Sequence, residues 1–281
     1  EFQENQLVLA RLPEAIFHAD DIRGPVADTL TAEVVAEIGR AVGSQAYDQG
    51  QQSVIVARDV RSSSKDLADA LVGGLNSTGR DVIDLGIIPA PVLYFATHYL
   101  GSDCGVMVSG DQSPPDWNGL KVVLGGECLS GDKLIDLGKR VERGDLLEGS
   151  GAVNEQELVP DYIDRVTTDV SIARPLKVVL DCGGGCAAAV APKLFRALGC
   201  ELVELSCELD LEHPGSGADL GRPESLQGLQ AAVLEHKADI GLAFGNSGAR
   251  LGVVDSGGGV VWADRLMMLL SADVLARHRA V

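Results

Sequence analysis

Short apolar runs alternate with amphipathic stretches along most of the chain. The runs have the length and composition of buried β-strands, and they cover residues 53–59, 82–85, 105–109, 177–181, 201–205 and 240–244. Between the runs, apolar residues recur at helical spacing, as Leu67, Leu71 and Leu75 do. Strands that are apolar on successive residues and alternate with helices indicate mostly parallel sheets covered by helices on both faces.

The order of these elements repeats once along the chain. A strand ending in Asp59, a helix, a turn at Gly79 and a second strand are matched by a second copy that begins at residue 177 and turns at Gly199. We therefore predict an α/β protein with two tandem repeats of a mostly parallel mixed sheet sandwiched by helices. A polar segment at 148–156, ahead of an expected helix at 159–170, separates the copies. The expected domains are residues 1–150 and 151–281.

Composition narrows the classes of function. Hydrophobic residues make up 46% of the 281 residues but aromatic residues only 4%, which predicts aliphatic cores. A net charge of −18 argues against binding to nucleic acids or anionic membranes. No segment approaches the roughly 20 apolar residues of a membrane span, and we expect a cytoplasmic protein. The six cysteines form no C-x-x-C pair, which favours reduced, buried thiols over a zinc or disulfide framework.

Two loops are the candidates for chemistry, because ligands of parallel sheets gather at the carboxyl ends of the strands. The segment 109–121 contains two prolines and a turn at Asn118-Gly119, so we expect a rigid loop that presents Asp111 at a fixed point. The segment 244–250 follows a buried strand but holds no carboxylate and a single cation, Arg250. The glycine-rich segment 181–186 suits a phosphate-binding nest or, as we favour, a tight strand-to-helix turn.

The first loop resembles a known motif. Ser109-Gly-Asp-Gln-Ser-Pro-Pro-Asp-Trp-Asn-Gly-Leu-Lys121 is similar to the phosphoserine loop, T-G/A-S-H-N-P-P-x-x-N-G-x-K, of the α-D-phosphohexomutases, the phosphomannomutase/phosphoglucomutase enzymes. Further segments resemble the family's other motifs in the family's order, and the resemblance covers essentially the whole chain. These segments are Phe17-His-Ala-Asp-Asp-Ile-Arg-Gly24, Ala57-Arg-Asp-Val-Arg61, Pro89-Ala-Pro-Val92 and Ala243-Phe-Gly-Asn-Ser-Gly-Ala-Arg250.

The departures from the family pattern fall on its chemistry. Asp111 stands at the place of the phosphorylated serine, with Gln112 at that of the neighbouring histidine. The three aspartates that bind Mg²⁺ in the family are replaced by Gly245, Ser247 and Ala249. Mg²⁺ takes hard oxygen ligands, usually carboxylates among them, and the resemblance therefore predicts no metal and no cofactor in this chain. The opening arginine is His18, and the family's H-H-P-D-P run is Ser216-Gly-Ala-Asp-Leu220.

These losses predict a catalytically inactive, phosphohexomutase-like module with a binding, regulatory or assembly role. The alternative is a fragment or variant of an active phosphomannomutase/phosphoglucomutase that interconverts hexose 1- and 6-phosphates. Asp111 then accepts the phosphoryl group, because carboxylates also serve as phosphoryl acceptors. We expect no nucleic acid and no membrane insertion. A protein partner, a homodimer or further domains of the same gene product are the expected partners.

Several charged positions match the family pattern, namely Arg23, Arg61, Lys121 and Arg250. The resemblance makes Asp111, Arg23, Arg61 and Lys121 the vestigial catalytic residues. We predict that Asp111 pairs with Arg250, Lys121 or Arg23, against the alternative that Asp111 is solvated in an open loop.

The family has four domains, and the sequence resembles the first two. Either the third and fourth, which bind the sugar hydroxyls and the distal phosphate, were left out or the gene product never had them.

Overall fold

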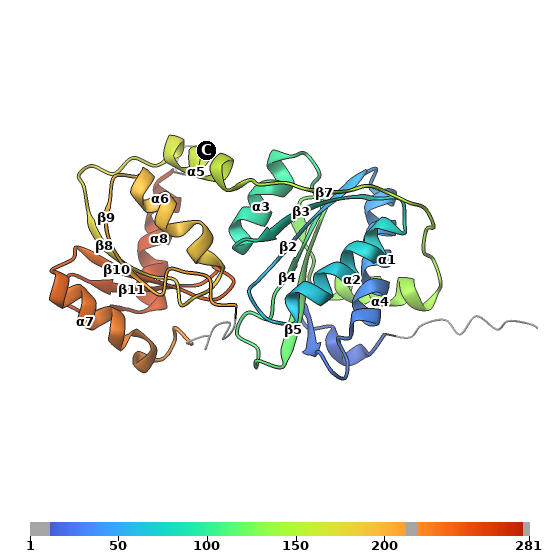
Figure 1. Cartoon of the computed structure of the whole chain (residues 1–281), viewed down its shortest axis with the longest axis horizontal. Coiled ribbons are helices and arrows are strands. Elements are labelled where there is room, and N and C mark those ends of the chain that lie inside the picture. Colours follow the sequence, from blue (N-terminus) through green and yellow to red (C-terminus); the bar gives the residue numbers. More distant parts are fainter. Residues whose placement is uncertain (1–11, 212–218, 278–281) are drawn as a thin grey trace, which may run out of the picture. The chain divides into compact units, whose positions relative to one another are not determined.

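The computed structural model describes residues 12–211 and 219–277. The chain divides into two compact units, with the division between Leu158 and Val159 (Figure 1). Each unit holds its own sheet and its own helices. Positions 216–218 of the altered H-H-P-D-P run lie outside the described residues.

The first unit is built on a seven-stranded mixed sheet. Its order is β1-β5-β4-β2-β3-β7, with β6 paired to the end of β5. The pairs β4–β2, β2–β3 and β3–β7 are parallel, whereas β5 is antiparallel to β1, β4 and β6. The strands are β1 (Ile22–Pro25), β2 (Ser53–Arg58), β3 (Asp81–Ile87), β4 (Gly105–Val108), β5 (Trp117–Leu124), β6 (Glu127–Cys128) and β7 (Val153–Glu155).

Helices cover both faces of this sheet. Helix α3 lies on one face and α1, α2 and α4 on the other (Figure 1). Successive residues of β2 alternate between the faces: Val54 and Val56 join the core under α1 and α2, and Ile55 between them is also fully buried. The helices are α1 (Ala32–Asp48), α2 (Ser64–Asn76), α3 (Ala90–Tyr99) and α4 (Asp132–Glu142), after a short 3-10 turn, η1 (Glu14–Ile16).

The second unit repeats the plan on a smaller scale. Its five-stranded sheet has the order β12-β11-β10-β8-β9, in which β10–β8 and β8–β9 are parallel and β11 is antiparallel to both neighbours. The strands are β8 (Lys177–Asp181), β9 (Glu201–Leu205), β10 (Ile240–Phe244), β11 (Leu251–Asp255) and β12 (Val260–Val261). The helical elements are α5 (Val159–Asp169), η2 (Cys186–Ala189), α6 (Ala191–Ala197), η3 (Pro223–Leu226), α7 (Gln227–His236) and α8 (Ala263–Arg277).

Two apolar cores flank the second sheet. Val179 and Ala243 pack under α7 on one face, and Val178, Leu180 and Leu242 pack with α6 on the other. Helix α8 differs from the rest, because none of its residues is buried.

The predicted fold class is confirmed: each unit is a mixed α/β sheet sandwiched by helices. The strands expected at 177–181, 201–205 and 240–244 agree with β8, β9 and β10. No helix in the described part of the chain is long and apolar enough to cross a membrane.

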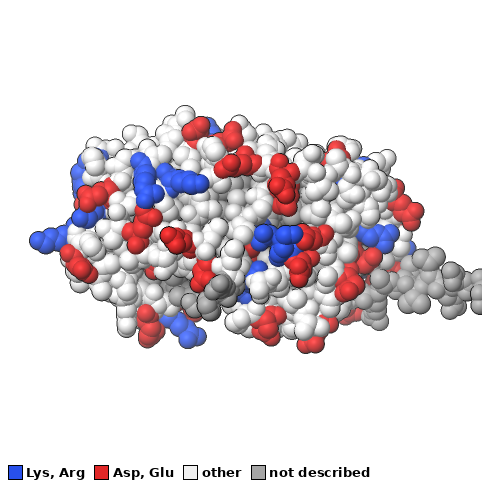
Figure 2. Space-filling model, viewed as in Figure 1, with Lys and Arg blue, Asp and Glu red and all other residues white. Residues whose placement is uncertain are grey.

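Acidic and basic side chains are interspersed on the face drawn in Figure 2, where the net charge of −18 shows as a predominance of acidic groups.

Candidate functional site

A buried carboxylate stands at the carboxyl end of β2. Asp59 is 0% exposed and follows the strand directly. One of its oxygens accepts hydrogen bonds from the Arg61 backbone N–H, at 3.0 Å, and from the Ser64 hydroxyl. The other accepts from the Ser109 hydroxyl at 2.9 Å and from the Gly110 N–H at 3.1 Å. Asp59 therefore joins the end of β2 to the loop that follows β4.

A buried guanidinium completes this attachment. Arg61 is 7% exposed, and its Nε lies 3.8 Å from an Asp59 carboxylate oxygen. Burial lowers the pKa of Arg61, and the carboxylates of Asp59, Asp111 and Asp116 oppose that shift. Arg61 donates to four backbone carbonyls of the loop, at distances of 2.6 to 3.1 Å; these belong to Asp111, Ser113, Pro114 and Trp117.

The segment 109–118 is thus wrapped around Arg61, and we call it the clamped loop. The side chain of Asn118 tethers its far end, because its amide donates to the hydroxyls of Ser63 and Ser64 at 2.8 and 2.9 Å. A charged donor that satisfies several carbonyls at once fixes a loop more firmly than neutral hydrogen bonds do. Arg61 therefore positions the loop from within, which is a different task from contacting a ligand.

Asp111 occupies a special backbone position in the clamped loop. Its φ is 44°, in the left-handed region that few non-glycine residues adopt. Its N–H donates to the Ser109 hydroxyl at 3.2 Å, and its carbonyl accepts from Arg61. The side chain is half-buried. The proposed pairing of Asp111 with Lys121, Arg23 or Arg250 stays a prediction; the Asp111 carboxylate also acts electrostatically on Arg61.

A second charged cluster lies on the strands beside the clamped loop. Arg23 of β1 is paired with Gly119 of β5 in the sheet, and its Nε lies 3.4 Å from the carboxylate of Asp21. Burial raises the pKa of Asp21, while Arg23, Lys121 and His18 act in the opposite direction and Asp20 adds to the rise. Two predicted residues, Arg23 and Lys121, thus share one carboxylate. Sequence analysis missed Asp21, although the motif 17–24 contains it.

The segment 245–250 in the second unit forms hydrogen bonds within its own backbone. The Gly245 N–H donates to the Arg250 carbonyl at 3.0 Å, and the Gly248 N–H donates to the Gly245 carbonyl at 2.8 Å. Outside support comes from the segment 182–186, because the Cys186 N–H donates to the Asn246 carbonyl at 2.9 Å. Asn246 and Ser247 are buried. We call this segment the short loop.

The short loop does not offer the ligands that Mg²⁺ prefers. Gly245, Ser247 and Ala249 provide one hydroxyl and no carboxylate. A Cβ at Gly245 would lie 3.3 Å from the Arg250 Cβ and 3.5 Å from its guanidinium carbon, so Arg250 fills the space that a larger side chain there would need. Within the described residues, no group of three or more His, Cys, Asp or Glu side chains is placed to hold a metal ion.

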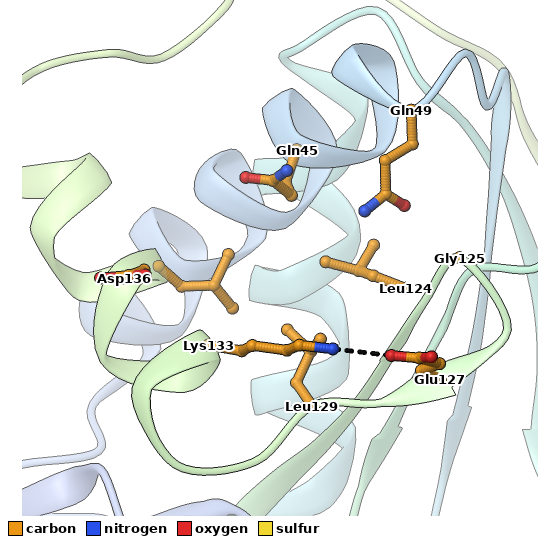
Figure 3. A pocket seen from close by; sticks show the side chains of 9 residues that line it. Gln45, Gln49, Leu124, Gly125, Glu127, Leu129, Lys133 and Asp136 are labelled. Carbon is orange, nitrogen blue, oxygen red and sulfur yellow. Dashed lines mark hydrogen bonds and ion pairs between the residues drawn. The ribbon is translucent and has the colours of Figure 1, made fainter.

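A cavity of the first unit lies away from the predicted residues. It has a volume of about 370 Å³ and is lined by α1, α4 and the β5–β6 hairpin (Figure 3). Gln45 and Gln49 face it from α1, and an ion pair of 2.6 Å joins Lys133 to Glu127 at its side. Because β5 is antiparallel to β4, Leu124 in its wall lies at the amino edge of the parallel strands. The cavity is therefore at the opposite edge from the clamped loop.

Comparison with protein families gives a match in each unit. The sequence model described as phosphoglucomutase/phosphomannomutase, α/β/α domain I, matches residues 14–145. The model of α/β/α domain II of the same proteins matches residues 160–258.

Individual relatives agree with this match. A phosphomannomutase/phosphoglucomutase of Pseudomonas aeruginosa is 45% identical over 95% of this chain and 58% of its own length. A phosphoglucomutase of Neisseria gonorrhoeae is 38% identical over 96% of this chain and 59% of its own. The crystal structure of a phosphoglucomutase/phosphomannomutase family protein from Burkholderia thailandensis has a TM-score of 0.88 and 42% identity, over 95% of this chain and 60% of that one. The chain thus spans less than two thirds of the length of these relatives.

Proposed function

Because the chain belongs to the phosphoglucomutase/phosphomannomutase family, we propose that it supplies the first two domains of an enzyme that interconverts hexose 1-phosphates and hexose 6-phosphates. The observation that carries this proposal is 45% identity to a phosphomannomutase/phosphoglucomutase over 95% of the chain. The similarity extends through both domains rather than resting on one motif.

This proposal replaces the inactive module that we first favoured. That expectation rested on altered positions in two loops, whereas the comparisons support an enzyme and contain no indication of inactivity. A binding or assembly role without catalysis is now the outcome that would contradict the proposal.

The expectation that the protein takes no cofactor is wrong for this family. Phosphohexomutases use Mg²⁺, and this chain is one of their relatives. Gly245, Ser247 and Ala249 nevertheless lack carboxylates, so these residues do not supply the ligands that Mg²⁺ prefers. No step of the proposed reaction is assigned to that loop.

The clamped loop is the proposed site of phosphoryl transfer, with Asp111 as acceptor. A carboxylate oxygen of Asp111 attacks the phosphorus, the bond between phosphorus and the sugar oxygen breaks, that oxygen takes up a proton to become a hydroxyl, and an acyl phosphate forms. The other sugar hydroxyl then loses its proton and attacks the phosphorus, and the bond between phosphorus and the Asp111 oxygen breaks, which regenerates the carboxylate. Phosphoryl transfer depends mainly on positioning and on neutralising charge. The Asp59–Arg61 attachment supplies the positioning, and Arg23 and Lys121 are the proposed cations.

The acceptor role has a direct test that does not require the rest of the relatives' length. The chain is incubated with a hexose 1,6-bisphosphate carrying labelled phosphate, and the protein is analysed for a covalent label. We expect label on the peptide that contains Asp111, released by hydroxylamine as an acyl phosphate is. Asp111→Asn should abolish labelling. Asp116→Asn, at an exposed carboxylate of the same loop, is the matched control and should retain it.

Turnover is the second measurement. Glucose 1-phosphate and mannose 1-phosphate, with Mg²⁺ and a bisphosphate activator, should be converted to the 6-phosphates by the protein in its natural length. Asp111→Asn should lower the rate by about a thousandfold or more, as removal of a nucleophile does. A rise in melting temperature with sugar phosphate but neither label nor turnover would indicate a sensor instead. The absence of all three responses would favour an assembly role.

A further inference from the structure

Two cysteines meet at the carboxyl edge of the second sheet. Cys182 follows β8, and Cys207 lies just beyond the end of β9, the neighbouring parallel strand. Their sulfur atoms are 3.3 Å apart. The Cys207 sulfur is also 3.3 Å from the carbonyl oxygens of Leu180 and Leu205, which hold the thiol against the strand ends. The pair is thus fixed by two adjacent strands.

The two thiols differ in their access to solvent. Cys182 is 0% exposed, whereas Cys207 is only partly buried and lines an open cavity of about 560 Å³. The hydrogen bond between the sulfurs lowers the pKa of Cys207 and, with burial, raises that of Cys182. Glu204 acts against the thiolate of Cys207, but the net direction for that thiol is downward. Cys207 is therefore the member of the pair that an oxidant can reach, and a cysteine reacts in its thiolate form.

We infer that Cys182 and Cys207 form a redox-active pair that a hydroperoxide converts to a disulfide. Cys207 is the residue that meets the oxidant through the cavity, and buried Cys182 resolves the product. This site is independent of phosphoryl transfer and goes beyond the proposed function. It also goes beyond the expectation drawn from sequence, which was reduced, buried thiols rather than a zinc or disulfide framework.

The chemistry balances with hydrogen peroxide as the oxidant. The Cys207 sulfur attacks one peroxide oxygen, a sulfur–oxygen bond forms, the oxygen–oxygen bond breaks, and the departing hydroxide takes up a proton to leave as water. The Cys182 sulfur then attacks the Cys207 sulfur, and the sulfur–oxygen bond breaks. That hydroxide takes the Cys182 proton and leaves as a second water. Two thiols are oxidised to a disulfide and one peroxide is reduced to water.

Closing this bond requires only a small movement. The sulfurs must approach from 3.3 Å to about 2.0 Å. The adjoining turn contains Gly183 and Gly184, both at positive φ, and continues to Cys186, whose N–H supports Asn246 of the short loop. Oxidation would therefore strain or shift the segment 182–186, which is the outside support of that loop.

Peptide mapping of the whole chain tests the inference. Dilute, reduced protein is treated with a small excess of hydrogen peroxide, remaining thiols are alkylated under denaturing conditions, and the digest is analysed without reductant. We expect one linked peptide pair joining Cys182 to Cys207, lighter by two hydrogen atoms, and the loss of two of the six thiols. A reductant such as dithiothreitol should restore both thiols.

Variants identify the roles. Cys207→Ser should abolish both the link and sulfenic acid, whereas Cys182→Ser should leave sulfenic acid on Cys207 that a dimedone probe captures. Cys200→Ser, at a half-buried thiol of the same unit, is the matched control and should form the link unchanged. Oxidation of Cys207 to sulfinic acid without a link in the native chain, or a link between other cysteines, would overturn the inference. The result for the native chain stands even where a variant fails to fold.

Discussion

The clamped loop and the short loop follow buried strands in the two units, yet they are held in opposite ways. The clamped loop surrounds a guanidinium and a carboxylate that are supplied from the end of β2, about fifty residues earlier in the chain. The short loop has two backbone hydrogen bonds within itself, from Gly245 to Arg250 and from Gly248 to Gly245, and it accepts another from the Cys186 N–H. A buried ion pair thus holds the clamped loop, whereas hydrogen bonds of its own backbone shape the short loop.

This difference bears on what a substitution in each loop would change. The residues that fix the backbone of the clamped loop, Asp59 and Arg61, are separate from the proposed acceptor, Asp111. A substitution of the Asp111 side chain therefore leaves the contacts that fix the loop in place. In the short loop Gly245 and Gly248 form the turn itself, and Arg250 packs against Gly245. A substitution there changes the side chain and the packing together.

The largest expected effect follows removal of the guanidinium. Arg61→Met leaves the Asp59 carboxylate buried without its cation, which should cost about 3–5 kcal/mol of the free energy of unfolding. Urea unfolding followed by the fluorescence of Trp117, in a Trp262→Phe background, reports on the first unit alone. The matched control is Arg40→Met, whose ion pair with Glu37 is partly exposed and should contribute less than about 1 kcal/mol. Equal losses in the two variants would refute a buried clamp.

A pair of glycine substitutions compares the loops directly. A Cβ at Gly110 would lie 2.4 Å from the guanidinium carbon of Arg61, which cannot move without breaking its contacts, so Gly110→Ala should cost about 1–3 kcal/mol. A Cβ at Gly245 would meet Arg250 no closer than 3.3 Å, and Gly245→Ala should cost less than about 1 kcal/mol. Unfolding of each unit by urea measures both values. A larger loss of unfolding free energy for Gly245→Ala than for Gly110→Ala would mean that the short loop, and not the clamped loop, is the more tightly packed of the two.

Local patterns in the sequence were enough to predict the strands that position both loops. Continuous apolar runs gave β8 and β10 at their observed bounds, because a strand buried on both faces needs apolar residues at every position. The bounds predicted for β9 also agree, although its residues are exposed or only half-buried. The helix α1, which packs closely on α2, was not predicted. The antiparallel strands β1, β11 and β12 were also missed, since their short segments carry little periodic signal.

The clamp itself was beyond the reach of local patterns. Asp59 was expected to end a strand, and Arg61 was named for its resemblance to a family motif. Their actual partners are the carbonyls and hydroxyl of residues fifty to fifty-six positions away. Every residue has a backbone carbonyl, whatever its side chain. The residue types of the loop therefore do not predict that its carbonyls accept hydrogen bonds from a buried arginine. The sequence also did not indicate that Asp59 and Arg61 would both be buried, and this burial is what makes them fix the loop.

A smaller effect distinguishes Asp181, the second unit's counterpart of Asp59. Asp181 ends β8 and accepts a hydrogen bond from the Gly183 N–H at 2.9 Å, and burial raises its pKa above 3.8 despite that bond. The folded state then binds the proton more tightly than the unfolded chain. Stability should therefore fall as pH rises from 3.8 through the raised pKa. Asp181→Asn should lack this decline, which urea unfolding at a series of pH values measures. An identical pH profile in the variant would contradict it.

The smallest expected effect is the pH dependence of stability that Asp239 contributes. Asp239 lies at the opposite edge of the same sheet, and its pKa is lowered rather than raised. Asp239 precedes β10, and its carboxylate accepts from Arg174 at 2.6 Å and from the Lys177 N–H at 2.8 Å, which lowers its pKa to about 2. Its contribution is present above 3.8 and is lost as pH falls through about 2. Arg174→Gln should reduce this acid-side loss and leave the Asp181 decline unchanged. Carboxyl NMR titration assigns each proton, with Lys193→Gln on α6 as the control. A changed slope of stability with pH above 3.8 in the Arg174 variant would mean that the two edges of the sheet are coupled.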